Sequence, residues 1–222
     1  MRSLPPLSLH LVTSRQRLAP DARTPAQALL ALESQIDEAI AAGVDVVQVR
    51  ERDLDARVLW AFVARLVARA GGSATRVIVN DRLDVALAAG AAGVHLPAAG
   101  LAADRVRVLA ADLLVGRSIH VGDMPADRAA CDYLYFGTVF PSESKGPGRP
   151  AAGVVALADT VARVARPVVA IGGVTPERVT SCLDAGAVGI AAISAFLPPG
   201  RAHDALGPRQ AVAEFRARLQ AP

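Results

Sequence analysis

The sequence predicts an α/β fold, a single (β/α)8 TIM barrel that spans residues 1–222. Short β-branched runs alternate with longer alanine-rich amphipathic runs, and roughly eight such units fit into the chain. Hydrophobic residues make up 52% of the chain but aromatic residues only 4%, which suits parallel strands covered by alanine-rich helices. An open doubly wound sheet shows similar features and is the alternative at this point.

Each expected strand is a short apolar run rich in β-branched residues, and each expected helix carries apolar residues at helical spacing. Gly43, Gly90 and Gly186 each follow an alanine at the end of such a helix, where glycine permits a left-handed turn into the next strand. The expected strands are 7–13, 44–50, 76–80, 93–96, 113–120, 133–137, 167–171 and 189–194. The expected helices are 26–42, 55–70, 83–89, 104–111, 154–164, 177–185 and 208–220.

Charge and composition exclude several classes of partner. The chain has Lys+Arg 24 against Asp+Glu 21, a net charge of +3, and the excess forms no basic run. Nucleic acid is therefore not expected, whereas small phosphorylated substrates are. No stretch is apolar enough for a transmembrane helix and the start does not fit a signal peptide, so we expect no membrane association and a cytoplasmic location. The oligomeric state is not fixed by the sequence, and a homodimer is one option.

The second expected strand ends in polar residues that need a function, because function in either architecture lies beyond the carboxyl ends of parallel strands. Gln48 and Arg50 share parity and so point to the same side, toward the barrel interior or its mouth. A buried arginine is costly without an anion or a carboxylate. Arg50 therefore indicates either an internal ion pair or, together with Arg52, a site for a diphosphate.

Polar residues also follow the third, fourth and fifth strands. Asp81, after Asn80, is either a ligand for a divalent ion or an N-cap for the next helix. His95 is expected to be a satisfied core histidine. Ser118 and His120 share one face of the fifth strand. A Ser–His pair for acyl transfer is a weak interpretation, because no acid partner or Gly-x-Ser-x-Gly turn accompanies them.

Phosphate-binding groups are concentrated after the last three strands. Ser142, Ser144 and Lys145 supply two hydroxyls and a mobile ammonium in a glycine-rich loop, although the loop is no Walker motif. The paired glycines Gly172 and Gly173 expose backbone N–H groups, and Ser194 follows the eighth strand. In barrels this region is the usual place for a substrate phosphate.

Taken in order, these residues resemble the thiamine-phosphate synthase/thiazole tautomerase superfamily, which includes the thiamine-phosphate pyrophosphorylase family. Gln48 to Arg52 resemble the segment that holds the pyrimidine diphosphate, and Asn80-Asp81 resemble the pair whose aspartate binds Mg²⁺. The resemblance implies that Ser118 contacts the pyrimidine. It implies that Lys145 contacts diphosphate. It places Ser142, Ser144, Gly172, Gly173, Ile193 and Ser194 around a thiazole phosphate.

The resemblance implies a thiamine-phosphate synthase, a transferase that condenses hydroxymethylpyrimidine diphosphate with thiazole phosphate and releases diphosphate. Arg50, Ser118 and Lys145 would serve the reaction, with Mg²⁺ on Asp81. The synthases carry a second magnesium-binding aspartate after the fourth strand. This chain has Pro97-Ala98-Ala99-Gly100 there, without a carboxylate, and Asp104 is the candidate substitute. The sequence leaves open whether residues 146–153 form a lid, although a loop rich in glycine and proline could close over a substrate.

Two alternatives stay open. Arg117 and the segment from His95 to Pro97 are closer to the thiazole tautomerase branch. That branch uses a histidine as acid and base where this chain has Thr138, so His120 would be the catalytic base here. A binder of thiazole phosphate without catalysis is the second alternative.

Overall fold

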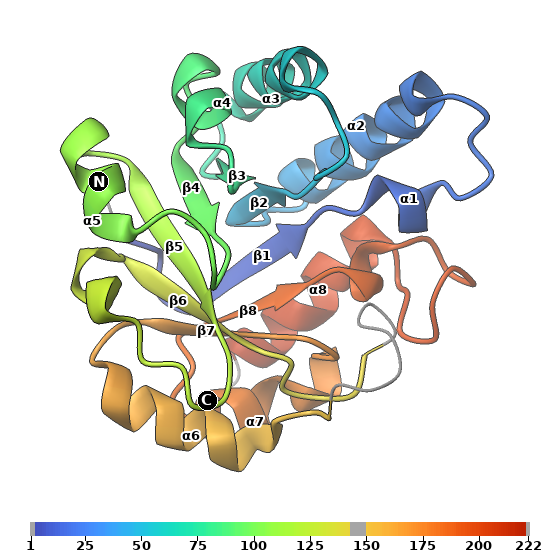
Figure 1. Ribbon diagram of the computed structural model, residues 1–222. Coiled ribbons are helices and arrows are strands. Elements are labelled where there is room, and N and C mark those ends of the chain that lie inside the picture. Colours follow the sequence, from blue (N-terminus) through green and yellow to red (C-terminus); the bar gives the residue numbers. More distant parts are fainter. Residues whose placement is uncertain (1–2, 143–149, 221–222) are drawn as a thin grey trace.

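The computed structural model of the protein describes residues 3–142 and 150–220. Eight parallel strands pair in chain order, and β1 pairs with β8 to close a barrel surrounded by helices (Figure 1). This closure confirms the predicted (β/α)8 barrel and rules out the open sheet. The strands are β1 (Ser8–Val12), β2 (Val46–Val49), β3 (Arg76–Asn80), β4 (Gly93–Leu96), β5 (Leu114–Ile119), β6 (Tyr133–Gly137), β7 (Val168–Ile171) and β8 (Gly189–Ala192).

Helices follow the strands as predicted, with three additions and one division. The α-helices are α1 (Arg15–Leu18), α2 (Pro25–Ala41), α3 (Ala56–Ala70), α4 (Leu83–Ala88), α5 (Ala103–Leu109), α6 (Gly153–Val164), α7 (Val179–Asp184) and α8 (Pro208–Leu219). The sequence did not predict α1 or the short 3-10 helices η1 (Ala126–Ala130) and η3 (Ser194–Phe196). The helix expected over 177–185 divides into η2 (Pro176–Arg178) and α7. Within the described ranges, no helix is long and apolar enough to span a membrane.

Local sequence signals set the helix ends. The Thr24 hydroxyl accepts a hydrogen bond from the Gln27 N–H at 3.2 Å and Pro25 opens α2, a combination that favours a helix start. Asp55, expected as the first residue of a helix, is instead the N-cap of α3 and accepts from the N–H groups of Arg57 and Val58 at 3.0 Å. Gly43, Gly90 and Gly186 have φ of 91°, 67° and 87°, which confirms the left-handed turns predicted at these positions.

The core has two parts. The larger lies between the strands and the surrounding helices and is aliphatic. The smaller fills the barrel interior, where buried Tyr133 and Tyr135 pack against His10 and His95. These side chains are large, so the neighbouring strand β5, which pairs with β6, must leave space for them. Gly116 on β5 does so, because a Cβ there would lie 2.1 Å from the Tyr133 ring and 2.6 Å from His95 Nδ1.

We expect Gly116→Ala to lower the free energy of unfolding by about 1–3 kcal/mol, because the new methyl group overpacks a rigid core. Urea denaturation monitored by circular dichroism measures this change. Val155→Ala on the exposed face of α6 is the control and should change stability by less than about 0.5 kcal/mol. Equal stabilities for the Gly116→Ala variant and the wild type would show that the interior adapts to the added volume.

Candidate functional site

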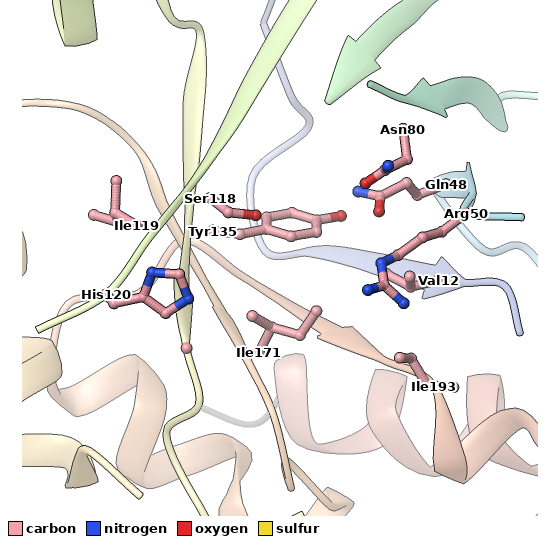
Figure 2. A pocket seen from close by; sticks show the side chains of 11 residues that line it. Val12, Gln48, Arg50, Asn80, Ser118, Ile119, His120, Tyr135, Ile171 and Ile193 are labelled. Carbon is pink, nitrogen blue, oxygen red and sulfur yellow. The ribbon is translucent and has the colours of Figure 1, made fainter. Parts of the chain in front are cut away.

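Three adjoining hollows lie at the carboxyl ends of the strands. The central hollow, of about 100 Å³, is lined by Val12, Gln48, Arg50, Asn80, Ser118, Ile119, His120, Tyr135, Gly137, Ile171 and Ile193 (Figure 2). The glycine hollow, of about 50 Å³, is lined by Ser142, Ile171, Gly172, Gly173, Val174, Ala192, Ile193, Ser194 and Asp204. The Asp81 hollow, of about 200 Å³, is lined by Val49, Glu51, Arg52, Leu54, Leu59, Asn80, Asp81 and Arg82. Shared wall residues connect the central hollow to each of the other two.

Gln48 and Arg50 lie on the same wall of the central hollow, as their parity predicts, and Figure 2 shows both beside Asn80. Gln48 is only 2% exposed, and no described residue accepts a hydrogen bond from its Nε2. A buried donor without a partner is destabilising, so a ligand with an acceptor atom would be bound favourably there.

Arg50 forms no ion pair with any described carboxylate, so the first of the two alternatives, an internal ion pair, is not found in the described part of the chain. Glu51, the adjacent acid, is instead paired with Arg15 at 2.8 Å. Partial desolvation, followed by the charge of Arg52, lowers the pKa of Arg50 below its ordinary value. A cation whose charged form is disfavoured by its surroundings gains from an anion, and the hollow beside it is therefore suited to one.

Ser118 and His120 both line the central hollow but are not paired with each other. The Ser118 hydroxyl is 2.8 Å from Nε2 of the buried His95, whose Nδ1 is 3.2 Å from the Tyr133 hydroxyl. His95 is thus the satisfied core histidine that the sequence predicted. His120 lies across the hollow from Arg50, and its Nδ1 is 3.2 Å from Asp123 (Figure 2). Ser118 is therefore paired with His95 and not with His120, and burial, which lowers the pKa of His95 to about 3, makes this histidine a poor base for a serine nucleophile.

The glycine hollow brings together Gly172, Gly173, Ile193 and Ser194, with Ser142 at its edge. Gly172 and Gly173 have φ of 95° and 63°, and no described residue accepts a hydrogen bond from their N–H groups. Glycine is required at both positions, since a Cβ would lie 2.5 Å from Thr138 in one case and 2.3 Å from the Pro141 carbonyl oxygen in the other. Two open N–H groups beside hydroxyls can hold a phosphate.

The Asp81 hollow contains Arg52, Asn80 and Asp81. The prediction that Asp81 caps the next helix is wrong, because Arg82 occupies the cap position of α4 and no side chain caps it. Asp81 adopts φ 65°, and its carboxylate makes no hydrogen bond or ion pair with another described residue. Arg52 lines the Asp81 hollow and does not line the central hollow.

The described part of the chain forms no metal centre made of protein ligands alone. Among the described residues, no three His, Cys, Asp or Glu side chains are placed to share a metal ion. Asp104 does not line the Asp81 hollow and bonds the adjacent Arg105 N–H at 2.7 Å. A Cβ on Gly100 would lie 3.3 Å from Asp81 Oδ1, so the loop passes close to Asp81 without a second carboxylate. The donors present fit a Mg²⁺ ion held by one carboxylate, water and substrate phosphates.

Several predicted features fall elsewhere. Ser144, Lys145 and residues 146–149, the first half of the possible lid segment 146–153, lie outside the described residues, and the structure does not test them. Arg117 is a buried support for the loop after β4, because it donates to the Ala98 carbonyl at 2.9 Å and pairs with Asp127 at 2.8 Å.

Two groups of residues were missed by the sequence analysis. Tyr135 forms part of the central hollow and hydrogen-bonds His10 at 2.6 Å. In the loop after β1, Arg15 pairs with Glu51 and Asp53, and Arg17 donates to the Ser194 hydroxyl at 2.9 Å. The sequence carries a signal for the second group, since Arg15 and Arg17 follow shortly after the first strand, at the carboxyl end where functional residues of such sheets lie.

Comparison with known proteins relates this chain to a family. The family model described as thiamine monophosphate synthase matches residues 19–196. The putative thiamine-phosphate synthase of Geobacter sulfurreducens is 38% identical over 196 residues, which cover 86% of each chain. The thiamine-phosphate synthase of Methanoculleus marisnigri is 40% identical over 167 residues, 73% of this chain and 78% of that protein.

Solved structures of similar fold include a protein whose name matches this family. Thiamine phosphate pyrophosphorylase from Pyrococcus furiosus has a TM-score of 0.76 at 28% identity, covering 96% of each chain. A 3-hexulose-6-phosphate synthase, at a TM-score of 0.65 and 19% identity, shares the fold.

The two interior histidines predict a pH dependence of stability. Burial, together with a neighbouring positive group, lowers the pKa of His10 and of His95 to about 3, whereas an unfolded histidine titrates near 6.5. The unfolded chain therefore binds more protons between these values, so stability is full above pH 6.5 and falls as the pH drops toward 3. Between pH 7 and pH 5 each histidine should reduce stability by at most about 2 kcal/mol.

In His95→Gln, the free energy of unfolding should fall less between pH 7 and pH 5 than in the wild type, by the contribution of one histidine. Urea unfolding at several pH values measures this difference. The matched control is His203→Gln, which replaces an exposed histidine and should leave the slope unchanged. A His95→Gln protein with the wild-type slope would mean that His95 has the same pKa in the folded and the unfolded chain.

Proposed function

The chain belongs to the thiamine monophosphate synthase family, and we propose that it condenses hydroxymethylpyrimidine diphosphate with thiazole phosphate to form thiamine phosphate and diphosphate. The observation that carries this proposal is the pair of adjoining hollows. Counting partners among the described residues alone, one offers an unpaired amide and an arginine without a carboxylate partner, and the other offers two open N–H groups. Two substrates, each with an anionic group, would lie side by side there.

The donor would occupy the central hollow. The Gln48 amide, with Asn80 and Ser118, would hold the polar edge of the pyrimidine, and the apolar side chains of Val12 and Ile193 would contact its ring. Arg50, with Arg52 on the adjacent wall and Lys145 from the loop after β6, would meet the diphosphate. Planar guanidinium groups bind such anions through two parallel hydrogen bonds.

The acceptor would have its phosphate in the glycine hollow. The N–H groups of Gly172 and Gly173 and the hydroxyl of Ser194 would donate to it, joined by Ser142 and Ser144. Ile171 and Ile193 form the wall shared with the central hollow, so the thiazole ring would face the pyrimidine across them.

The reaction breaks the bond between the pyrimidine methylene carbon and the diphosphate oxygen, and the electron pair leaves with the diphosphate. The thiazole nitrogen supplies its lone pair to the methylene carbon and forms the new C–N bond. No protein nucleophile or base is required, so positioning and charge stabilisation by Arg50, Arg52 and Lys145 account for catalysis. A Mg²⁺ ion on Asp81 and the diphosphate, when bound, would neutralise charge on the leaving group.

We expect Arg50→Ala to lower kcat/KM for the diphosphate substrate by about 100-fold or more, because a charged contact to the leaving group is lost. Formation of thiamine phosphate from both substrates with Mg²⁺ is followed by chromatography. Arg201→Ala is the control: this arginine lies outside the hollows, in an exposed pair with Asp21. Wild-type protein that makes no thiamine phosphate would refute the proposed function, and full activity of Arg50→Ala would refute the role of Arg50.

Asp81→Asn should raise the Mg²⁺ concentration needed for half-maximal activity by about 10-fold, with little change in stability. Asparagine tolerates the left-handed backbone that Asp81 adopts, so the variant removes charge without strain. Asp84→Asn, which removes an exposed carboxylate paired with Arg82, controls for a change in local charge. An unchanged Mg²⁺ dependence in Asp81→Asn would exclude Asp81 as the ligand.

A further inference from the structure

The four-residue helix α1 carries two arginines that reach different loops at the mouth of the barrel. Arg15 points to the loop after β2, where it bonds Glu51 at 2.8 Å and Asp53 at 2.6 and 2.5 Å. Arg17, two residues later, reaches the loop after β8 and donates from Nη1 to Ser194 Oγ at 2.9 Å. Because Arg15 is buried and held by two carboxylates, the position of α1 and hence of Arg17 is fixed.

Ser194 lines the glycine hollow, so the Arg17 guanidinium contacts a residue of its lining, although Arg17 does not itself line the hollow. The described residues that line this hollow offer neutral donors, and Asp204 adds a carboxylate. Two arginines contact this lining: Arg17 bonds the Ser194 hydroxyl, and Arg178 is already held by the Gly173 carbonyl oxygen at 2.6 Å and by the Phe140 ring. Neutral N–H and hydroxyl groups solvate an anion but supply no net charge, and the carboxylate repels it. A phosphate in the glycine hollow would therefore depend on a nearby cation.

We propose that Arg17 is a phosphate-binding residue of the glycine hollow, and that it makes the protein select a phosphorylated acceptor over the corresponding alcohol. The identification of the acceptor as a thiazole rests on the proposed function. A guanidinium has five N–H donors in a planar fork, so Arg17 can bond the Ser194 hydroxyl and a phosphate oxygen together.

A structural role makes a different prediction. If Arg17 serves only to hold Ser194, then its removal costs no more than the loss of the Ser194 hydroxyl, and the effect does not depend on the charge of the ligand. If Arg17 binds phosphate directly, its removal costs more than Ser194→Ala and acts on the phosphorylated ligand alone.

Isothermal titration calorimetry, without the diphosphate substrate, tests this proposal. The ligands are thiazole phosphate and the thiazole alcohol, and the proteins are wild type, Arg17→Ala, Arg17→Lys, Ser194→Ala and Asp204→Asn. Arg17→Ala should weaken binding of thiazole phosphate by about 10-fold or more and leave binding of the alcohol within about twofold. Arg17→Lys should fall between wild type and Arg17→Ala, and Asp204→Asn should strengthen binding of the phosphate.

The proposal is overturned if Arg17→Ala binds thiazole phosphate as wild type does, or if it loses no more affinity than Ser194→Ala. It is also overturned if the wild type binds neither thiazole phosphate nor inorganic phosphate. Circular dichroism confirms that each variant is folded. Because no turnover is involved, wild-type protein that binds thiazole phosphate through Arg17 but makes no thiamine phosphate refutes the proposed reaction alone.

Discussion

The buried carboxylate of Glu51 connects the two loops on which the rest of the site depends. It accepts from the Thr13 hydroxyl at 2.7 Å, from the Arg15 N–H at 3.1 Å and from the Arg15 guanidinium at 2.8 Å. The same Thr13 hydroxyl accepts from the Arg50 N–H at 2.9 Å. A buried charge is tolerated only when it is fully paired, so the loops after β1 and β2 are held in one relative position. Arg50, Arg52 and Arg17 all extend from this fixed pair of loops.

The barrel interior shows why the site has a rigid floor. His10, His95, Tyr133 and Tyr135 satisfy one another by hydrogen bonds and ring contacts, and burial keeps both histidines neutral near pH 7. Gln48 is the exception, because its amide nitrogen has no partner among the described residues. The described polar groups of the interior are thus paired except where they border the central hollow. There the Gln48 amide N–H is an open donor, and a bound ligand would complete the network.

The sequence predicted the fold well, because strand and helix periods and the glycines at helix ends are local signals. It also placed Gln48, Arg50, Ser118 and the two glycines correctly at the carboxyl ends of the strands. Partnership was harder to predict. The sequence left open whether Arg50 has an internal carboxylate partner, and it gave no sign that Arg15 would pair with Glu51, because pairing depends on which loops meet in space. The same reason explains why Arg17 was missed, since its contact joins residues 177 positions apart.

The proposed binding of two anionic substrates in adjoining hollows would raise a problem of repulsion, which the arrangement of arginines would address. In a mouth partly shielded from water, like charges repel more strongly than in bulk solvent. Arg50 lines the central hollow, and the wall between this hollow and the glycine hollow consists of the apolar Ile171 and Ile193. Arg17 approaches the glycine hollow from the opposite loop, through Ser194. Each anion would thus have its own cation, and only uncharged ring surfaces would meet at the shared wall, where the new bond forms.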